Sequence, residues 1–166
     1  MTAINIRPEV SADCGTIHTL TQAAFKDMPF SDGDEPDLVD RLRADGDLTL
    51  SLVAEDATRI VGHIAFSPVE ISDGTKNWYG LGPVSVWPDL QKGGIGGALI
   101  NRGIADLREI GARGIILLGS PVYYSRFGFE HDPALTYPGP PPEYFQRLVL
   151  TGEQPSGEVR YSAAFG

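Results

Sequence analysis

A glycine-rich segment between an extended run and a helical run constrains the fold of this chain more than any other feature. It reads Gln91-Lys92-Gly93-Gly94-Ile95-Gly96, after an apolar stretch over 81–86 and before helical periodicity over 95–110. A loop that ends a strand and opens a helix leaves backbone N–H groups unpaired, and with the helix dipole they attract an anion such as a pyrophosphate. Glycine lets the phosphate approach those amides. The segment therefore predicts a phosphorylated ligand.

The spacing of the glycines excludes two common phosphate-binding loops. A Walker loop needs G-x-x-x-x-G-K-[ST], and no Lys-Ser or Lys-Thr pair follows these glycines. A dinucleotide fingerprint G-x-G-x-x-G that starts at Gly94 would need glycine at position 99, which is Leu99. The pattern that remains is Q-x-x-G-x-G.

The rest of the chain alternates between strand and helix patterns. Residues 113–118 form a short apolar run, so strand, loop, helix and strand make a parallel crossover that is expected to be right-handed. Pro83 cannot donate a ladder hydrogen bond, so it marks an edge, a bulge or a splay in its strand. Periodicity and turn residues also predict strands at 4–7, 48–54 and 60–71, helices from 11 or 13 to 25 and at 36–44, and a closing hairpin of 148–151 with 159–165.

Two motifs at the correct separation resemble those of a known family. The pattern at 91–96 resembles motif A of the GNAT superfamily of N-acetyltransferases. The segment 123–129 resembles motif B, where a tyrosine, here Tyr124, stands four residues before the glycine of a Gly-Phe pair. Similar segments at 67–69, 81–83 and 159–161 extend the resemblance to the YhbS-type group of small prokaryotic acetyltransferases over nearly the whole chain.

The resemblance implies an α/β (α+β) fold, with a single GNAT domain over 1–166. Its mixed, partly parallel sheet would have six to seven strands, helices on both faces and splayed central strands. In that family, motif A holds the pyrophosphate of acetyl-coenzyme A, and the pantetheine arm pairs with the splayed strand like an added strand. The cofactor-binding residues expected on this basis are Val84, Ser85, Val86, Gln91, Lys92, Gly93, Gly94, Ile95, Gly96, Gly97 and Tyr124.

The implied activity is direct transfer of the acetyl group to an amine, by an acyltransferase that transfers groups other than amino-acyl groups. The backbone N–H of Val84 would stabilise the developing oxyanion. Tyr124 is the candidate general acid, since a phenol is protonated at pH 7 and can protonate a thiolate; alternatively it packs or contacts the sulfur without chemistry. The acceptor could be a small molecule or a protein amine. The alternative function is a non-catalytic acyl-coenzyme A sensor or partner module.

No residue of the sequence stands out as the general base. The strand at 78–86 contains no acid, and Glu70, at the end of the preceding strand, is the candidate, with a solvated strand end as the alternative. His63, further back in that strand, is more typical of a core histidine. Ser120 stands where relatives often carry Asp or His, and a deprotonated amine could instead arrive through ordered water. The acids expected to line the acceptor entrance are Asp27, Asp32, Asp34 and Glu35.

Composition narrows the set of partners. The net charge of −9 argues against nucleic acid or an anionic membrane, and the chain shows neither a membrane-length apolar stretch nor a signal segment. Cys14 is the only cysteine, so the cytoplasm is the expected location. His18, His63 and His131 lack Cys or acid at ligand spacing, so no metal is predicted. The expected partners are acetyl-coenzyme A and an amine, in a monomer or homodimer.

Overall fold

A six-stranded mixed sheet forms the centre of the molecule in the computed structural model, which describes residues 3–29, 31 and 33–165. The strands follow the order β1-β2-β3-β5-β6-β8, and only β5 and β6 are parallel neighbours. Their bounds are Asn5–Pro8 for β1, Leu50–Glu55 for β2, Ile60–Pro68 for β3, Trp78–Val86 for β5, Gly114–Leu118 for β6 and Phe145–Val149 for β8. The mixed, partly parallel sheet expected from the sequence is confirmed.

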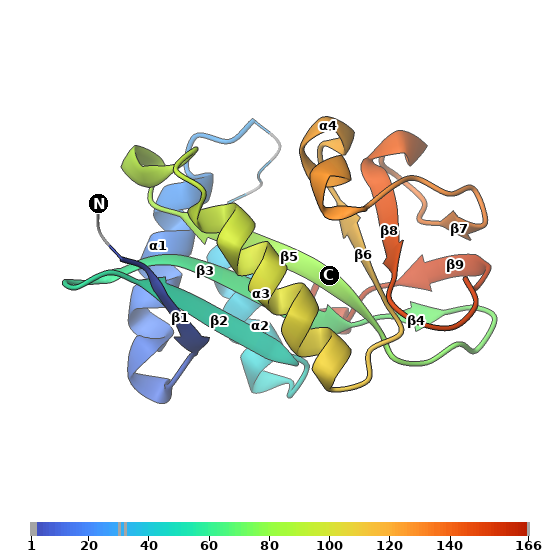
Figure 1. Cartoon of the computed structure of the whole chain (residues 1–166), viewed down its shortest axis with the longest axis horizontal. Coiled ribbons are helices and arrows are strands. Elements are labelled where there is room, and N and C mark those ends of the chain that lie inside the picture. The colour runs from blue at the N-terminus through green and yellow to red at the C-terminus, as the bar shows by residue number, and fades with distance from the viewer. Residues whose placement is uncertain (1–2, 30, 32, 166) are drawn as a thin grey trace.

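Helices cover both faces of this sheet (Figure 1). α1 (Cys14–Phe25) and α2 (Glu35–Ala44) lie on one face, and α3 (Ile95–Glu109) crosses the other. Shorter helical segments are α4 (Pro121–Tyr124) and the 3-10 turns Ser11–Asp13, Pro88–Leu90, Ser125–Phe127, Pro142–Tyr144 and Ala163–Phe165. Within the described ranges, no helix has both the length and the apolar character needed to cross a bilayer.

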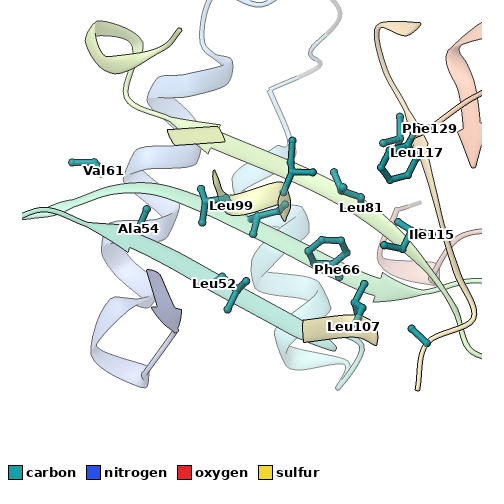
Figure 2. Packing of buried hydrophobic residues seen from close by; sticks show 13 residues of the cluster. Leu52, Ala54, Val61, Phe66, Leu81, Leu99, Leu107, Ile115, Leu117 and Phe129 are labelled. Carbon is teal, nitrogen blue, oxygen red and sulfur yellow. The ribbon is translucent and has the colours of Figure 1, made fainter. Parts of the chain in front are cut away.

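The main core holds α3 against the sheet. Phe66 of β3 lies with Leu99 and Leu107 of α3 in one fully buried cluster (Figure 2). Gly103 stands where the helix crosses the ring of Phe66, and a Cβ atom at that position would overlap the ring. Glycine therefore allows α3 to approach the sheet closely.

The central strands β5 and β6 separate along their length. They pair only from Trp78↔Gly114 to Gly80↔Ile116, whereas β5 stays paired with β3 as far as Gly62↔Val86. The register between β3 and β5 shifts by one residue where Gly82 and Pro83 stand opposite Ala65, in agreement with the irregularity predicted at Pro83. Beyond Gly80, the edge of β5 that faces β6 thus has no strand partner among the described residues, and Figure 1 shows the two strands diverging.

A second, three-stranded sheet of order β4-β9-β7 corrects two expectations from the sequence. Its strands are Glu70–Ile71 (β4), Gly157–Arg160 (β9) and Leu135–Thr136 (β7). The predicted strand 60–71 is broken at Val69, so β4 leaves the main sheet. The predicted closing hairpin is wrong, because β8 pairs with β6 and β9 pairs with β4 and β7. These pairings join segments far apart in sequence, where periodicity holds no information about the partner.

Candidate active site

The opening between β5 and β6 leads to a cavity of about 710 Å³ beside the start of α3. Of the residues predicted to bind the cofactor, those that line it are Val84, Val86, Gln91, Lys92, Gly94, Ile95, Gly96, Gly97 and Tyr124. Gly93 lies in the same loop but not on the wall, and Ser85 is buried at the position opposite His63 on β3. The loop and the diverging strand thus form one site.

The glycine-rich loop has the backbone geometry of a helix start that presents its amides. Gly94 is the N-cap of α3 with φ of 90°, a left-handed conformation that favours glycine. The first intrahelical bond that uses its carbonyl comes from the N–H of Ala98, at 3.0 Å. The N–H groups of Ile95, Gly96 and Gly97 therefore have no partner within the helix, and they lie at its positive end. This arrangement suits an anionic group in the cavity.

Motif B forms the opposite wall of this cavity. Ser120 caps α4, since its hydroxyl accepts a hydrogen bond from the N–H of Tyr123 at 3.3 Å. The rings of Tyr123 and Tyr124 meet edge to face with centroids 5.0 Å apart, and Tyr124 meets Phe129 in the same way at 6.1 Å. Burial, with a smaller contribution from Tyr123, raises the pKa of Tyr124 to about 12. Its phenol is therefore protonated at neutral pH.

A second cavity of about 540 Å³ adjoins the first. Val84 and Tyr124 line both cavities, so they stand at the junction. Aromatic residues from distant parts of the chain form much of the second wall; they are Phe25, Tyr137, Tyr161 and Phe165. Tyr137, Tyr161 and Phe165 were not among the predicted site residues, and their only signal in the sequence is that they are aromatic residues of the proline-rich loop and the C-terminal segment.

The geometry agrees with the family to which the sequence is similar. A family model for the acetyltransferase (GNAT) domain matches residues 5–131. The chain belongs to the GNAT family of acetyltransferases. Among curated relatives, this GNAT protein is 38% identical to the uncharacterized N-acetyltransferase YhbS of Escherichia coli K12 over 139 residues, which are 81% of this chain and 80% of YhbS. It is 37% identical to the uncharacterized N-acetyltransferase YjhQ of the same strain over 116 residues, which are 66% and 64% of the two chains.

Two solved structures are similar to this GNAT protein over nearly its whole length. A GNAT family acetyltransferase from Brucella melitensis in complex with acetyl-coenzyme A has a TM-score of 0.89 and 48% identity, with 99% of each chain covered. YhbS from Escherichia coli in complex with coenzyme A has a TM-score of 0.89 and 34% identity, with 99% of this chain and 93% of that chain covered. The GNAT fold and family expected from the two motifs are confirmed.

Glu70 lies apart from the other residues predicted for catalysis in this GNAT protein. It belongs to β4, where it is exposed and pairs with Arg160 of β9. Val84 pairs with Ile64 of β3 in the main sheet, whereas Glu70 follows the break at Val69 and pairs in the second sheet. Glu70 lines neither cavity. Its expected role as base is therefore not supported, because the break at Val69 carries it into the second sheet.

His63 is a core histidine, as the sequence favoured. It is fully buried, and its Nε2 lies 2.7 Å from the hydroxyl oxygen of Ser51, which in turn donates to Glu9. Burial lowers the pKa of His63 to about 4, so the ring is neutral at pH 7. Arg43 holds Glu9 through a two-bond ion pair with both distances at 2.9 Å. This network lies on the α1 and α2 side of the sheet and does not line either cavity.

The acids expected at the acceptor entrance divide into three groups. Asp34 and Glu35, at the start of α2, line the second cavity. Asp27 lines neither cavity, and Asp32 lies outside the described residues. Ser31 donates a hydrogen bond to Glu35 at 2.5 Å. Half of the expected cluster is thus at the second cavity.

The fold also brings His18 close to two acids that are distant in the sequence. His18 of α1 and Asp37 and Asp40 of α2 place their ligand atoms within 4.8 Å of one another. The expectation that no histidine has an acid at ligand spacing is therefore wrong for His18, because the two helices pack together. Asp40 lies 2.9 Å from His18 Nδ1 and 3.2 Å from the guanidinium of Arg43, so its carboxylate already has two protein partners.

Proposed function

We propose that this protein transfers the acetyl group of acetyl-coenzyme A directly to an amine acceptor, without a covalent acyl-enzyme. The observation that carries the proposal is that Val84 and Tyr124 line both cavities, so a thioester from one side and an amine from the other would meet between them. The acetyl-coenzyme A bound by the Brucella relative supports the choice of acyl donor.

The residues and the open strand edge of the first cavity suit the chemistry of coenzyme A. The unpaired N–H groups of residues 95–97 suit the pyrophosphate, and Lys92 on the same wall adds a positive charge. The open edge of β5 from Val84 to Val86 can pair with the amides of the pantetheine arm as an added strand would. Such pairing uses the backbone alone, which agrees with plain apolar side chains at these two positions.

The chemistry requires little from the protein beyond two placed donors. Bound acetyl-coenzyme A supplies an acetyl thioester. The C–N bond forms as the C–S bond breaks, and the N–H of Val84 donates to the negative charge that develops on the acyl oxygen. Tyr124 gives its proton to the departing sulfur. The proton that the amine loses then restores the phenol. Burial that raises the pKa of Tyr124 would also raise that of the thiol, so the proton transfer stays closer to balanced than the phenol's pKa of about 12 suggests.

Release of free thiol from acetyl-coenzyme A in the presence of a broad panel of primary amines tests the proposal. Turnover that depends on an amine, with the acetylated amine found by mass spectrometry, would support it. Calorimetry with coenzyme A serves as the control for binding. Binding of coenzyme A without turnover on any amine would instead favour a non-catalytic acyl-coenzyme A module.

A further inference from the structure

The second cavity contains few groups that could remove a proton from an amine. Among the described residues that line either cavity there is no histidine, and Asp34 and Glu35 are the only carboxylates. Carboxylic acids ordinarily have a pKa near 4 and alkylammonium ions one near 10, so transfer of a proton between them is strongly uphill. The other polar side chains on the second wall are the guanidinium of Arg41 and the phenols of Tyr124, Tyr137 and Tyr161, groups that serve as proton donors and not as bases.

The basicity of the acceptor therefore decides how much reactive amine is present. At pH 7.5, about a quarter of an α-amine with a pKa near 8 is neutral, against about one molecule in a thousand of an alkylamine with a pKa near 10.4. The ratio is roughly two-hundredfold in favour of the α-amine. With no base among the described lining residues, this difference in neutral fraction favours the α-amine, and the lower nucleophilicity of a less basic amine offsets part of it.

The second wall also presents a group of packed aromatic rings. The rings of Tyr137 and Tyr161 meet edge to face with centroids 5.0 Å apart, and Phe165 continues the wall 4.9 Å from Tyr161. Tyr161 is held against β5 at Gly80, where a Cβ atom would stand 2.9 Å from its ring. Burial raises the pKa of Tyr161 far above its usual value, as expected for an aromatic surface closed to water on one side. Such a wall favours aromatic partners through edge and face contacts.

Charge at the same cavity favours an acceptor without a free carboxylate. Asp34 and Glu35 carry two negative charges against the single positive charge of Arg41, whose Nε already donates to the carbonyl of Ala164 at 3.0 Å. The two carboxylates and the aromatic faces attract a protonated amine, whereas the carboxylates repel an anion.

We infer that the acceptor is a weakly basic primary amine of the α-amino type, borne on an aromatic body that has no free carboxylate. The inference rests on the proposed function and names the chemical class of its acceptor. The amine would come either from a small aromatic amino-acid derivative or from a chain that begins with an aromatic residue, since both present the same group to the cavity.

Four acceptors that differ in ring and basicity test the inference. Phenylalanine amide has both features, 2-phenylethylamine keeps the ring but is strongly basic, glycine amide is weakly basic without the ring, and ethylamine has neither. Phenylalanine amide should show the highest kcat/KM at pH 7.5, with an advantage over 2-phenylethylamine of up to roughly two-hundredfold. The pH at which kcat/KM reaches half its plateau should move with the pKa of each acceptor. A midpoint that is the same for all acceptors would reveal a base on the protein and overturn the inference.

A variant of the aromatic wall tests the second feature. Phe165→Ala should reduce the preference for phenylalanine amide over glycine amide by about tenfold. Tyr144→Ala is the matched control, because Tyr144 is similarly exposed, at 44% against 37%, and lines neither cavity.

Equal use of phenylalanine amide and glycine amide by the unmodified protein would overturn the inference while leaving acetyl transfer intact. No turnover with any amine, despite binding of acetyl-coenzyme A, would overturn the proposed function itself. Comparison of phenylalanine amide with a short peptide that begins with phenylalanine distinguishes a small-molecule acceptor from a chain terminus. A higher rate with either of the two supports the proposed class of acceptor.

Discussion

The ring of Tyr124 lies so close to Gly119 that a Cβ atom on Gly119 would stand 2.5 Å from its Cε2 atom. The residue that follows β6 therefore has to lack a side chain for the phenol to reach the junction of the two cavities. Gly119→Ala should displace the ring and lower kcat by tenfold or more, with coenzyme A affinity nearly unchanged. Gly15→Ala in α1 is the matched control, since a Cβ atom there meets nothing within 4 Å. Equal kcat in the Gly119 variant, measured by thiol release, would show that the position of the phenol is unimportant.

The phenol of Tyr124 is expected to act as the acid. Tyr124→Phe keeps the ring and removes the hydroxyl, so it should lower the single-turnover rate by roughly 10²-fold while coenzyme A still binds. Because the active form is the protonated one and the pKa is raised to about 12, the wild-type rate should not fall as pH rises to 10. Tyr144→Phe provides the control. A wild-type rate in the Phe variant would mean that Tyr124 only packs.

The start of α3 is expected to bind the pyrophosphate through its amides. Gly94→Glu and Gly96→Glu should abolish binding of acetyl-coenzyme A, because each introduces bulk and negative charge at those N–H groups. Gly94→Ala and Gly111→Ala separate this effect from backbone strain, since the two glycines have φ of 90° and 89° with open space around them. Both should lose about 1 kcal/mol of stability, and only the first should weaken binding in calorimetry. Unchanged affinity in folded Gly94→Glu would disprove the assignment of the loop.

Buried His63 should make the fold sensitive to acid. Its pKa is about 4 in the folded protein and near 6.5 when unfolded, so between these values the unfolded chain binds the proton and the folded chain does not. Stability should therefore fall as pH drops from 6.5 to 4, by about 3 kcal/mol from this residue. In His63→Gln this part of the pH dependence, measured by urea unfolding, should be absent, whereas His131→Gln should retain it. The same slope in the His63 variant would place the acid sensitivity elsewhere.

Features that depend on neighbouring residues were accessible from the sequence. The glycine-rich loop, the helix that follows it, the strand at 113–118 and the irregularity at Pro83 are local choices of backbone conformation and burial pattern. They include motif A, and with motif B at 123–129 they were sufficient to predict the fold and nine of the residues that line the first cavity.

The sequence failed where pairing partners had to be chosen over a distance. Glu70 appeared to continue the strand of His63, but the chain leaves the main sheet at Val69 and pairs with β9. In the same way, β8 pairs with β6 instead of the predicted hairpin partner. The energy that selects between such partners comes from burying whole faces, and it is not encoded in the alternation of any one strand.

By itself the sequence thus determined the family, the crossover unit and the phosphate-type loop, because each follows from a few adjacent residues. Only the tertiary structure decided that Val84 and Tyr124 stand between two cavities, and that Tyr137, Tyr161 and Phe165 share a wall with α2. Contacts among residues so far apart in the sequence depend on how the sheets and helices pack around one core. That packing is a property of the whole chain.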